Sequence, residues 1–362
     1  MAIMHSRRVG ALAGAVISLS ALISSAHGEE PAWKYKVDVW SVPFDTKSAT
    51  RQMEYVPLAK ADKKYDICAS FPHMKDSYWL AADYGMIQEA RRQGVKLQIV
   101  EAGGYTELNR QISQIEDCVS AGAQAVIIGA ITSDGLNNLI ADVKKKGVKV
   151  VDTINGVSSK DIDAKSIISW ELVGKTIGQF LAAKHPKGGP TVEVGWFPGP
   201  AGAGFVEDAT RGFQAGVKDS AVKVVEVKYG DTGKEVQTKL IEDTLQAHPE
   251  IKYIAGSAVA AEAAIPIVRA RGLDSNVGIL SYYFTPGMRQ GIERGQVLAA
   301  ASDSTVMQGR MAVDQAVRIL EGKDFMKHIG PSILVITKDN IGSQEMTALL
   351  APDNFSPVFQ TQ

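Results

Sequence analysis

The sequence is poor in the residues that catalytic and metal sites usually need. Its 362 residues include two cysteines and six scattered histidines. Two cysteines without clustered histidine or carboxylate partners argue against a metal site. The chain also has no Gly-x-Ser-x-Gly elbow and no Gly-x-x-x-x-Gly-Lys-Ser/Thr phosphate loop. We therefore expect neither an enzyme nor a protein with a cofactor.

The chain also lacks an excess of charge of either sign. Its 39 Lys and Arg and 40 Asp and Glu leave a formal net charge of -1. Nothing therefore draws the protein toward a nucleic acid or an anionic membrane surface. With 45% hydrophobic and 22% charged residues, the composition is that of an ordinary globular protein. The length suggests about two domains.

Long apolar runs are absent except near the N-terminus. Arg7 and Arg8 precede an apolar stretch over residues 9–23, and the small residues Ala26 and Gly28 follow it. This pattern predicts a secretory signal peptide over residues 1–28. A membrane anchor is the alternative, but the stretch is shorter than the ~20 residues that a span needs. We expect a soluble mature protein in the periplasm.

Export would place Cys68 and Cys118 in an oxidising compartment, where a disulfide persists. Cys68 falls in a predicted strand and Cys118 on a predicted helix that faces the same sheet. The alternative is that both are small, unpaired core residues. The sequence leaves both possibilities open.

Short β-branched runs alternate with helical patterns from residue 64 onward, which is typical of a parallel sheet covered by helices. The first predicted set has strands over 65–71, 95–100, 125–128 and 148–154, and helices over 80–93, 106–120 and 136–146. The pattern then restarts, with strands over 192–197, 222–229, 253–255 and 277–281, and helices over 171–184, 209–217, 235–247 and 260–271. The fold class is therefore α/β, with two doubly wound parallel-sheet lobes.

The restart also predicts where the lobes begin and end. We expect an irregular extension over 29–60, a first lobe over 61–168 and 285–322, and a second lobe over 169–284 and 323–362, which includes a C-terminal extension. Three hinge crossings are expected near residues 155–170, 281–286 and 321–325. In this scheme residues 297–300 return to the first lobe.

Aromatic residues gather just past the predicted strand ends, although only 7% of the chain is aromatic. The carboxyl ends of the strands in two such lobes line one crevice, where ligands bind. The alternative is that the rings cap the sheets as ordinary core. The aromatic residues in question are Tyr78, Trp79, Tyr105, Trp170 and Tyr283.

A cage of Trp and Tyr rings suits a compact methylated cation or dipole, because ring faces attract a positive methyl shell. Tyr hydroxyls and Trp indole N–H groups can donate to an oxygen of the same ligand. Asp76 or Asp303 can complement its positive charge. The Gly-rich segment 199–204 is a weaker candidate, a phosphate cradle whose spacing fits no dinucleotide motif and which contains Pro200.

Several segments resemble the type I periplasmic binding proteins that sense trimethylamine N-oxide. The most specific are Lys75-Asp76-Ser77-Tyr78-Trp79 and Glu101-Ala102-Gly103-Gly104-Tyr105, supported by the segments 84–86, 258–264, 300–303 and 331–337. Cys68 and Cys118 also match positions where such proteins carry cysteine. The similarity extends over almost the whole mature chain.

The resemblance implies a protein that binds trimethylamine N-oxide and reports to the periplasmic domain of a sensor histidine kinase in a two-component system. It also implies a ligand cage formed by Asp76, Tyr78, Trp79, Tyr105, Trp170 and Tyr283. The residues that flank Trp170 and Tyr283 depart from the pattern of the group. The main alternative is a substrate-binding protein of an ABC transporter for a sugar or a betaine-like amine.

Overall fold

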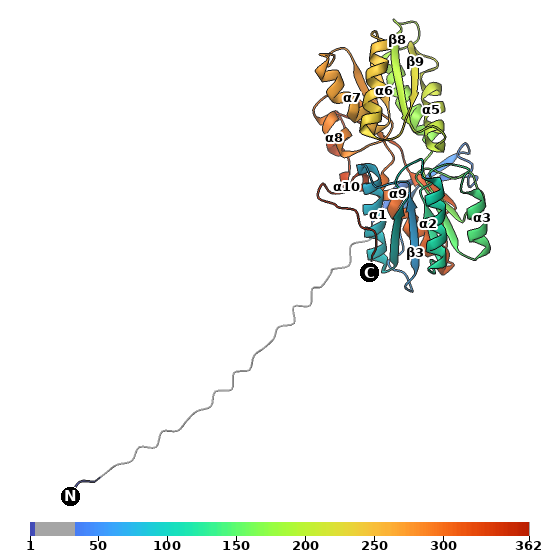
Figure 1. Cartoon of the computed structure of the whole chain (residues 1–362), viewed down its shortest axis with the longest axis vertical. Helices are drawn as coiled ribbons and strands as arrows, with labels where there is room; N and C mark the ends of the chain where they lie inside the picture. Colours follow the sequence, from blue (N-terminus) through green and yellow to red (C-terminus); the bar gives the residue numbers. More distant parts are fainter. Residues whose placement is uncertain (4–32, 362) are drawn as a thin grey trace. The chain divides into compact units, whose positions relative to one another are not determined.

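The computed structural model describes residues 1–3 and 33–361. Most of the predicted signal peptide lies outside the described residues. The compact unit Ala32–Gln362 contains two α/β lobes, each built on its own sheet (Figure 1).

The first lobe is built on an eight-stranded sheet with the order β2-β1-β13-β7-β6-β5-β3-β4. Its strands are β1 (Tyr35–Trp40), β2 (Thr50–Tyr55), β3 (Asp66–Phe71), β4 (Lys96–Glu101), β5 (Ala125–Ile128), β6 (Lys149–Thr153), β7 (Ala164–Ser166) and β13 (His328–Pro331). All pairs are parallel except β1–β2 and β1–β13. The four residues of β5 are buried, as expected for a parallel strand covered on both faces.

Helices cover both faces of this sheet, as the side chains of β5 indicate. Ile127 belongs to the hydrophobic cluster that includes α1, whereas Val126 and Ile128 belong to the cluster of α2 and α3. The helices of this lobe are α1 (Ser77–Gln93), α2 (Leu108–Ser120), α3 (Asn137–Lys145), α9 (Thr305–Glu321) and the short α10 (Met346–Leu349) against α9. Helices α1 and α9 pack closely because Gly85 lacks a side chain: a Cβ there would lie 2.1 Å from the carbonyl oxygen of Val306.

The second lobe is built on a six-stranded sheet with the order β14-β12-β11-β10-β8-β9. Its strands are β8 (Val192–Gly199), β9 (Val222–Tyr229), β10 (Tyr253–Gly256), β11 (Gly278–Ser281), β12 (Ala299–Ser302) and β14 (Leu334–Thr337). Its helices are α4 (Trp170–Lys184), α5 (Gly204–Val217), α6 (Lys234–Ala247), α7 (Ala258–Ala270) and α8 (Pro286–Glu293), and the 3-10 turn η1 (Ile341–Ser343) follows β14. Only the pairing of β12 with β14 is antiparallel.

The predicted return of residues 297–300 to the first lobe is wrong. Ala300 pairs with Ser281 of β11 on one side and with Ile336 of β14 on the other, so β12 belongs to the second sheet. The segment after β11 leads into α8 and back to the neighbouring strand, which is the usual crossover in a parallel sheet. No crossing between the lobes therefore occurs at 281–286.

Two of the three predicted crossings between the lobes lie at other residues in the structure. It first leaves the first sheet after β7, within the predicted range 155–170, and it returns between β12 and α9. It crosses again at residues 332–333, between β13 and β14, and not at 321–325. The reason is that β13 pairs with β7 and so keeps residues 323–331 in the first lobe.

Described parts of both terminal extensions also belong to the first lobe. Residues 29–60 were expected to be irregular, but they contain β1 and β2, an antiparallel pair that extends the first sheet through β13. At the other end, Thr361 N–H donates to the carbonyl oxygen of Leu97 at 2.9 Å, which places the C-terminus beside β4 (Figure 1). The assignment of all of 323–362 to the second lobe is therefore wrong.

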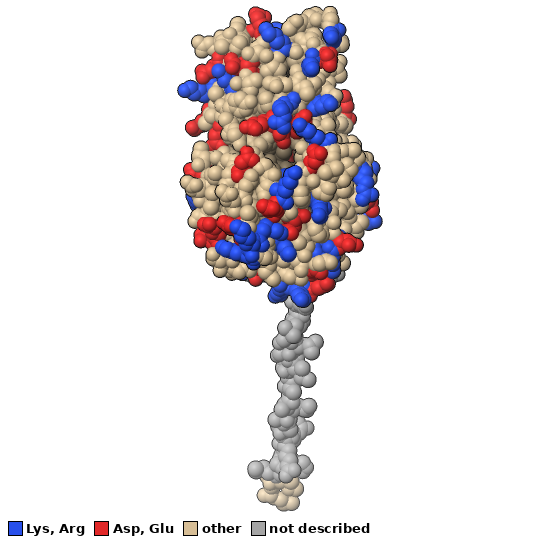
Figure 2. Space-filling model, turned by 90° about the vertical axis from the view of Figure 1, so that its right-hand side faces the viewer, with Lys and Arg blue, Asp and Glu red and all other residues tan. Residues whose placement is uncertain are grey.

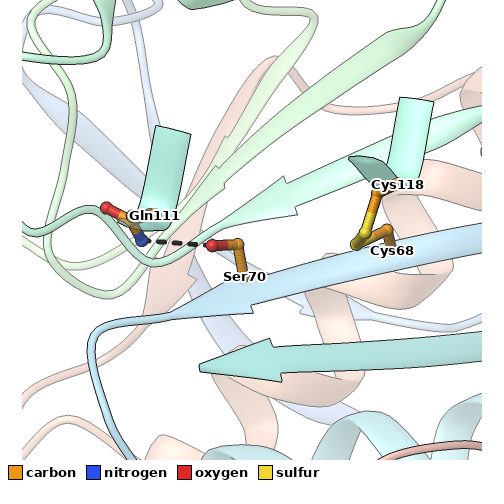
Figure 3. Close-up of a disulfide and its surroundings, with 4 residues drawn as sticks. All are labelled: Cys68, Ser70, Gln111 and Cys118. Atoms are coloured by element: carbon orange, nitrogen blue, oxygen red, sulfur yellow. Dashed lines mark hydrogen bonds between the residues drawn. A yellow bond between two sulfur atoms is a disulfide. The ribbon is translucent and has the colours of Figure 1, made fainter. Parts of the chain in front are cut away.

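A disulfide joins Cys68 of β3 to Cys118 of α2, with a Cα–Cα distance of 6.2 Å (Figure 3). Nearer the start of α2, Gln111 Nε2 donates to Ser70 Oγ at 3.2 Å and to the carbonyl oxygen of Gly129 at 2.9 Å. Helix α2 is thus fastened to the sheet at two points, one covalent and one polar.

The face of the molecule in Figure 2 shows no large field of one sign. Basic and acidic side chains are interspersed over the face seen in Figure 2, in agreement with the net charge of -1. Among the helices of residues 1–3 and 33–361, none combines the length and the apolar character that a membrane span requires.

Candidate ligand-binding site

All but one of the residues predicted to bind a ligand line a single cavity. Tyr78 and Trp79 lie in the first turn of α1, Tyr105 follows β4, Trp170 begins α4 and Tyr283 follows β11. These rings and Asp76 surround the cavity, and the lining is completed by Asn155, Phe205 and Thr232. The cavity therefore takes side chains from both lobes.

Asp76 places the first turn of α1 against the cavity. Its backbone is extended, and Oδ1 accepts hydrogen bonds from the backbone N–H of Tyr78 at 3.1 Å and of Trp79 at 3.2 Å. This is the usual role of Asp before a helix. The same carboxyl group thus caps the helix and lines the cavity.

Rings from the two lobes meet across the cavity. Tyr78 and Tyr283 lie 5.0 Å apart between ring centroids with planes at 66°, and Tyr105 and Phe205 lie 5.8 Å apart. Trp170 lies 5.6 Å from Phe205. These separations and tilts are typical of favourable aromatic pairs. The lobes are therefore closed upon each other in this conformation.

The space that the rings leave is small, with a volume of ≈20 Å³. That is enough for about one water molecule. A compact ligand would require a much smaller outward shift of the rings than a sugar. A larger groove of ≈610 Å³ lies at the other end of the second lobe, where strands β8, β10 and β11 begin, and it includes His185, Tyr253 and Arg294. No aromatic cage forms there, so the smaller cavity is the candidate ligand site.

The polar groups of the cavity have distinct tasks. The indole N–H of Trp170 donates to the carbonyl oxygen of Ile154 at 2.5 Å, so Trp170 presents its ring and not its donor. The Tyr105 hydroxyl accepts from Asn155 Nδ2 at 3.0 Å and retains its own hydrogen. The Tyr283 hydroxyl has no hydrogen-bond partner within the described part of the chain. Tyr105 and Tyr283 therefore have hydroxyl hydrogens available to a ligand oxygen.

Ile154 holds an unusual backbone conformation. Its φ of 62° is in the left-handed region, which a β-branched residue rarely adopts. The conformation lies directly after β6 and presents the carbonyl oxygen that receives the Trp170 indole. Such strain is often found at ligand sites.

Asp303 is the predicted residue that does not line the cavity. It is buried behind Tyr78, whose hydroxyl donates to its Oδ2. Gln308 Nε2 donates to the same oxygen at 2.6 Å, and Thr305 Oγ1 donates to Oδ1 at 3.1 Å. Asp303 thus orients the Tyr78 ring and has no open path to a ligand.

One carboxyl group, that of Asp76, lines the cavity, and two more, those of Asp303 and Glu262, lie behind the lining. Burial raises the pKa of Asp76, although His73 opposes the shift. Burial also raises the pKa values of Asp303 and of Glu262, a nearby acid whose Oε1 accepts from Thr285. Each carboxylate is destabilised by the loss of water, so positive charge in the cavity would favour its ionised form.

Sequence reasoning missed Asn155, Phe205 and Thr232. Asn155 and Thr232 follow strand ends as the aromatic residues do, but their small polar side chains are also common in ordinary loops. Phe205 follows the Gly-rich segment 199–204, which brings the start of α5 close to the first lobe: a Cβ on Gly204 would lie 3.1 Å from Cβ of Ser133. The segment places an aromatic ring at the cavity, a function different from the phosphate cradle considered above.

The model of the periplasmic binding protein domain matches residues 67–324, more than half of the chain. The chain belongs to the periplasmic binding protein family. This periplasmic binding protein is 36% identical to the periplasmic protein TorT of Escherichia coli K12 over 303 residues, which are 83% of this chain and 86% of TorT. Its fold is the type I fold of the family, with two lobes of mostly parallel sheet.

Solved structures of two relatives are similar to this periplasmic binding protein. One is an ABC transporter solute-binding protein from Bradyrhizobium sp. BTAi1 with bound Bis-Tris, with a TM-score of 0.80 and 57% identity, covering 90% of this chain and 98% of that one. The other is TorT in complex with the TorS sensor domain, without ligand, with a TM-score of 0.75 and 34% identity over 82% of this chain and 100% of that one. The same complex has been solved with trimethylamine N-oxide, at a TM-score of 0.74 and 33% identity.

Proposed function

We propose that this protein binds trimethylamine N-oxide, or a similar small methylated amine, and reports the bound state to the periplasmic domain of a TorS-like sensor histidine kinase. The observation that carries the proposal is the convergence of five Tyr and Trp rings on one small cavity between the lobes. TorT, whose complex with TorS has been solved with trimethylamine N-oxide, is a relative at 33% identity.

The cavity supports this ligand through shape and charge. Methyl groups on a positive nitrogen are attracted to ring faces, which Trp79 and Trp170 offer. The oxygen of the ligand needs donors, and the hydroxyls of Tyr105 and Tyr283 have hydrogens to give. A sugar would need many more polar partners than the cavity lining contains.

The polar surroundings favour a dipolar ligand in a second way. Helices α1 and α4 begin at the cavity with Tyr78, Trp79 and Trp170. The partial positive charge of a helix N-terminus favours a negative oxygen nearby. The carboxyl of Asp76 would face the positive nitrogen. Both ends of the ligand dipole would thus meet complementary charge.

A second candidate is a solute-binding protein of an ABC transporter, for a betaine-like amine or a sugar. It is favoured by the 57% identity to the Bradyrhizobium protein. Bis-Tris is itself a substituted amine, so its presence there agrees with amine recognition in this fold. The two candidates share the cage and differ in the membrane partner.

The protein would act outside the cytoplasm, after removal of a signal peptide over residues 1–28. Support comes from the apolar stretch at 9–23 followed by Ala26 and Gly28, and from the membership of the periplasmic binding protein family. We also propose that it is a binding protein without catalytic activity. N-terminal sequencing of the exported protein tests the cleavage site, which we expect after Gly28.

Calorimetric titration decides the ligand. Purified mature protein, kept free of Bis-Tris, is titrated with trimethylamine N-oxide, glycine betaine, choline and ribose. We expect the strongest binding for trimethylamine N-oxide and none for ribose. Tyr283→Phe keeps the ring and removes the hydroxyl, so it should lower the affinity for the N-oxide more than for choline. Ribose binding without N-oxide binding would contradict the proposal.

The partner needs a separate experiment. The purified periplasmic domain of a TorS-like kinase is mixed with the protein, with and without trimethylamine N-oxide, and the complex is measured by analytical ultracentrifugation. We expect a complex whose affinity changes with the ligand. Ligand binding without any complex would favour the transporter candidate. A permease gene beside that of the protein would point the same way.

A further inference from the structure

His73 and Thr232 connect loops that belong to different lobes. His73 lies between β3 and α1 of the first lobe, and Thr232 lies between β9 and α6 of the second. Their side chains form a hydrogen bond of 3.2 Å between His73 Nε2 and Thr232 Oγ1. A contact of this kind forms only when the lobes are closed. It therefore distinguishes the closed conformation from any open one.

The tautomer of the His73 ring follows from its second contact. The backbone N–H of Lys75 donates to His73 Nδ1 at 3.3 Å, so this nitrogen carries no proton. The neutral ring must then carry its proton on Nε2, which donates to Thr232 Oγ1. Protonation of Nδ1 would remove the acceptor that Lys75 N–H uses.

The His73 ring also touches the ligand cage. It meets Trp79 and Tyr105 edge to face, with centroid separations of 6.3 and 5.5 Å. The ring is 1% exposed. Opening of the lobes would remove Thr232 and admit water to one side of the ring.

We propose that His73 and Thr232 form a latch between the lobes, which holds the protein closed around its ligand while the ring is neutral and is weakened when the ring is protonated, because closure buries the ring away from water. This inference rests on the proposed ligand binding in the cage. The latch would make ligand affinity, and the signal that depends on closure, weaker in acid. The pH effect needs no contact between the ligand and His73, which does not line the cavity.

The direction of the pH effect follows from burial. With the lobes closed, burial lowers the pKa of His73, whereas in the open state the ring is solvated and keeps a pKa of about 6.5. At a pH above this open-state pKa the ring is neutral in both states and closure is unaffected. As the pH falls below it, the open state takes up a proton and the closed state loses relative stability.

Other charged groups face the His73 ring, and their contributions to the pH dependence must be separated from that of His73. They are Asp76 at the start of α1, Lys75 beside it, Asp231 in the loop after β9 and Glu101 at the end of β4. Asp76 has a raised pKa in the closed state, so its own effect has the opposite sign: acid favours closure. The pH response of the protein must therefore be compared with that of a variant that lacks only the imidazole.

The test is the affinity for trimethylamine N-oxide at about pH 8 and about pH 5.5, on either side of the ordinary pKa of His. His73→Gln keeps an amide donor and an acceptor but does not titrate. We expect the affinity of the parent protein to fall severalfold in acid, and at most about tenfold per pH unit. The affinity of His73→Gln should stay level or rise. Equal pH responses in the two proteins would overturn the latch.

The hydrogen bond itself is tested at about pH 8, where His73 is neutral. Thr232→Val removes the hydroxyl and keeps the shape, while Thr232→Ser keeps the hydroxyl. We expect Thr232→Val to lower the affinity about two- to tenfold, which is the usual effect of one hydrogen bond. Thr232→Ser should bind more tightly than Thr232→Val. Equal affinities for Thr232→Val and the parent would contradict the inference.

A measurement without ligand separates failure of the latch from failure of the proposed function. Amide hydrogen exchange of residues 230–233 reports how often the loop after β9 leaves the first lobe. We expect faster exchange in Thr232→Val than in Thr232→Ser at the same pH. If the parent binds no trimethylamine N-oxide, the proposed function fails and this comparison still decides the latch. Equal exchange rates would overturn it.

Discussion

At the scale of single residues, the site depends on which part of each side chain faces the cavity. Trp170 directs its indole N–H to the carbonyl oxygen of Ile154, and so its ring is held in one orientation. Asp303 holds Tyr78 in the same way from behind. These rings are pre-positioned by hydrogen bonds on their far side, which lowers the entropy that a ligand must overcome on binding.

Trp170→Ala is expected to weaken the binding of trimethylamine N-oxide about tenfold. The substitution removes a ring face, which contributes about 0.5–2 kcal/mol to the binding of a desolvated cation. It also leaves the carbonyl oxygen of Ile154 without the indole N–H that donates to it. Calorimetric titration measures the loss. Trp170→Phe, which keeps a ring without the N–H group, should lose less.

Trp170→Ala also tests the alternative that Trp170 is an ordinary core residue, since its ring is only 3% exposed in the closed conformation. Circular dichroism and thermal unfolding of Trp170→Ala, without ligand, separate the two. A folded protein with weak binding supports the cage. Unfolding, or binding equal to that of the parent, would remove Trp170 from the site.

Asp76 combines two functions that different substitutions can separate. Asp76→Asn keeps an oxygen that can accept from Tyr78 N–H and Trp79 N–H, because Asn is as good as Asp before a helix. We expect this variant to fold normally and to bind the ligand more weakly, since it lacks the negative charge. Asp76→Ala should in addition lose about 1 kcal/mol of stability with the helix cap.

Urea unfolding and titration of the two variants make the distinction. Equal stability of Asp76→Asn and Asp76→Ala would show that the cap contributes nothing. Equal ligand affinity of Asp76→Asn and the parent would show that the carboxylate charge is not used by the ligand.

At the scale of elements, the disulfide joins a strand to the helix that covers it. Cys68 and Cys118 are 50 residues apart in sequence, so the bridge closes a long loop in the unfolded chain. Their replacement by Ala in a double variant should lower the free energy of unfolding by about 2–4 kcal/mol. Urea unfolding measures this. Ligand affinity should hardly change, because neither residue lines the cavity.

Thiol counting on the denatured, unreduced protein is the direct check of the bridge. We expect no free thiol in the protein isolated from the periplasm. If two thiols react, and the double variant is as stable as the parent, the bridge does not form in the protein.

Helices α4 and α5 pack closely because glycines face each other's backbone. A Cβ on Gly174 would lie 2.0 Å from the carbonyl oxygen of Ala209, and rigid backbone has little freedom to move away. Gly174→Ala should therefore destabilise the protein by about 1–3 kcal/mol, as overpacking does. Gly342→Ala is the matched control, since a Cβ there has open space. Thermal unfolding of both variants tests the prediction, and equal melting temperatures would contradict it.

At the scale of the whole molecule, function depends on closure of two lobes that the chain connects at several places. Ring pairs such as Tyr78–Tyr283 exist only in the closed state, so a ligand held among these rings binds the closed state better than the open one. A ligand shifts such an equilibrium only by this difference in affinity. Hinge closure is the usual switching motion of such two-lobed proteins.

Saturating trimethylamine N-oxide should therefore both compact and stabilise the protein. At a ligand concentration about 100 times the Kd, the gain in stability is about 2.7 kcal/mol. Small-angle X-ray scattering should record a smaller radius of gyration, and thermal unfolding a higher Tm. With a tenfold higher Kd, Trp170→Ala should gain only about 1.4 kcal/mol at the same concentration, and so show a smaller rise in Tm. A higher Tm without compaction would mean that binding does not require closure.

Much of this protein could be predicted from its sequence, because the signals involved are local. The alternation of apolar strands such as β5 with amphipathic helices such as α2 indicates a two-lobed α/β fold. The position of rings after strand ends predicted where Tyr105 and Tyr283 lie, since the carboxyl ends of parallel strands meet at one edge. Both residues line the cavity, and this placement does not depend on which side chains they contact there.

Other features depend on contacts between distant segments and were decided only by the tertiary structure. Nothing local in Ala299–Ser302 tells which sheet it joins; its pairing with β11 and β14 does. Asp303 has the sequence position of a ligand contact, yet its carboxylate meets Tyr78, 225 residues away. The bond between His73 and Thr232 likewise joins residues 159 positions apart. Sequence periodicity determines which face of an element is buried, but the partner on that face depends on how the lobes close.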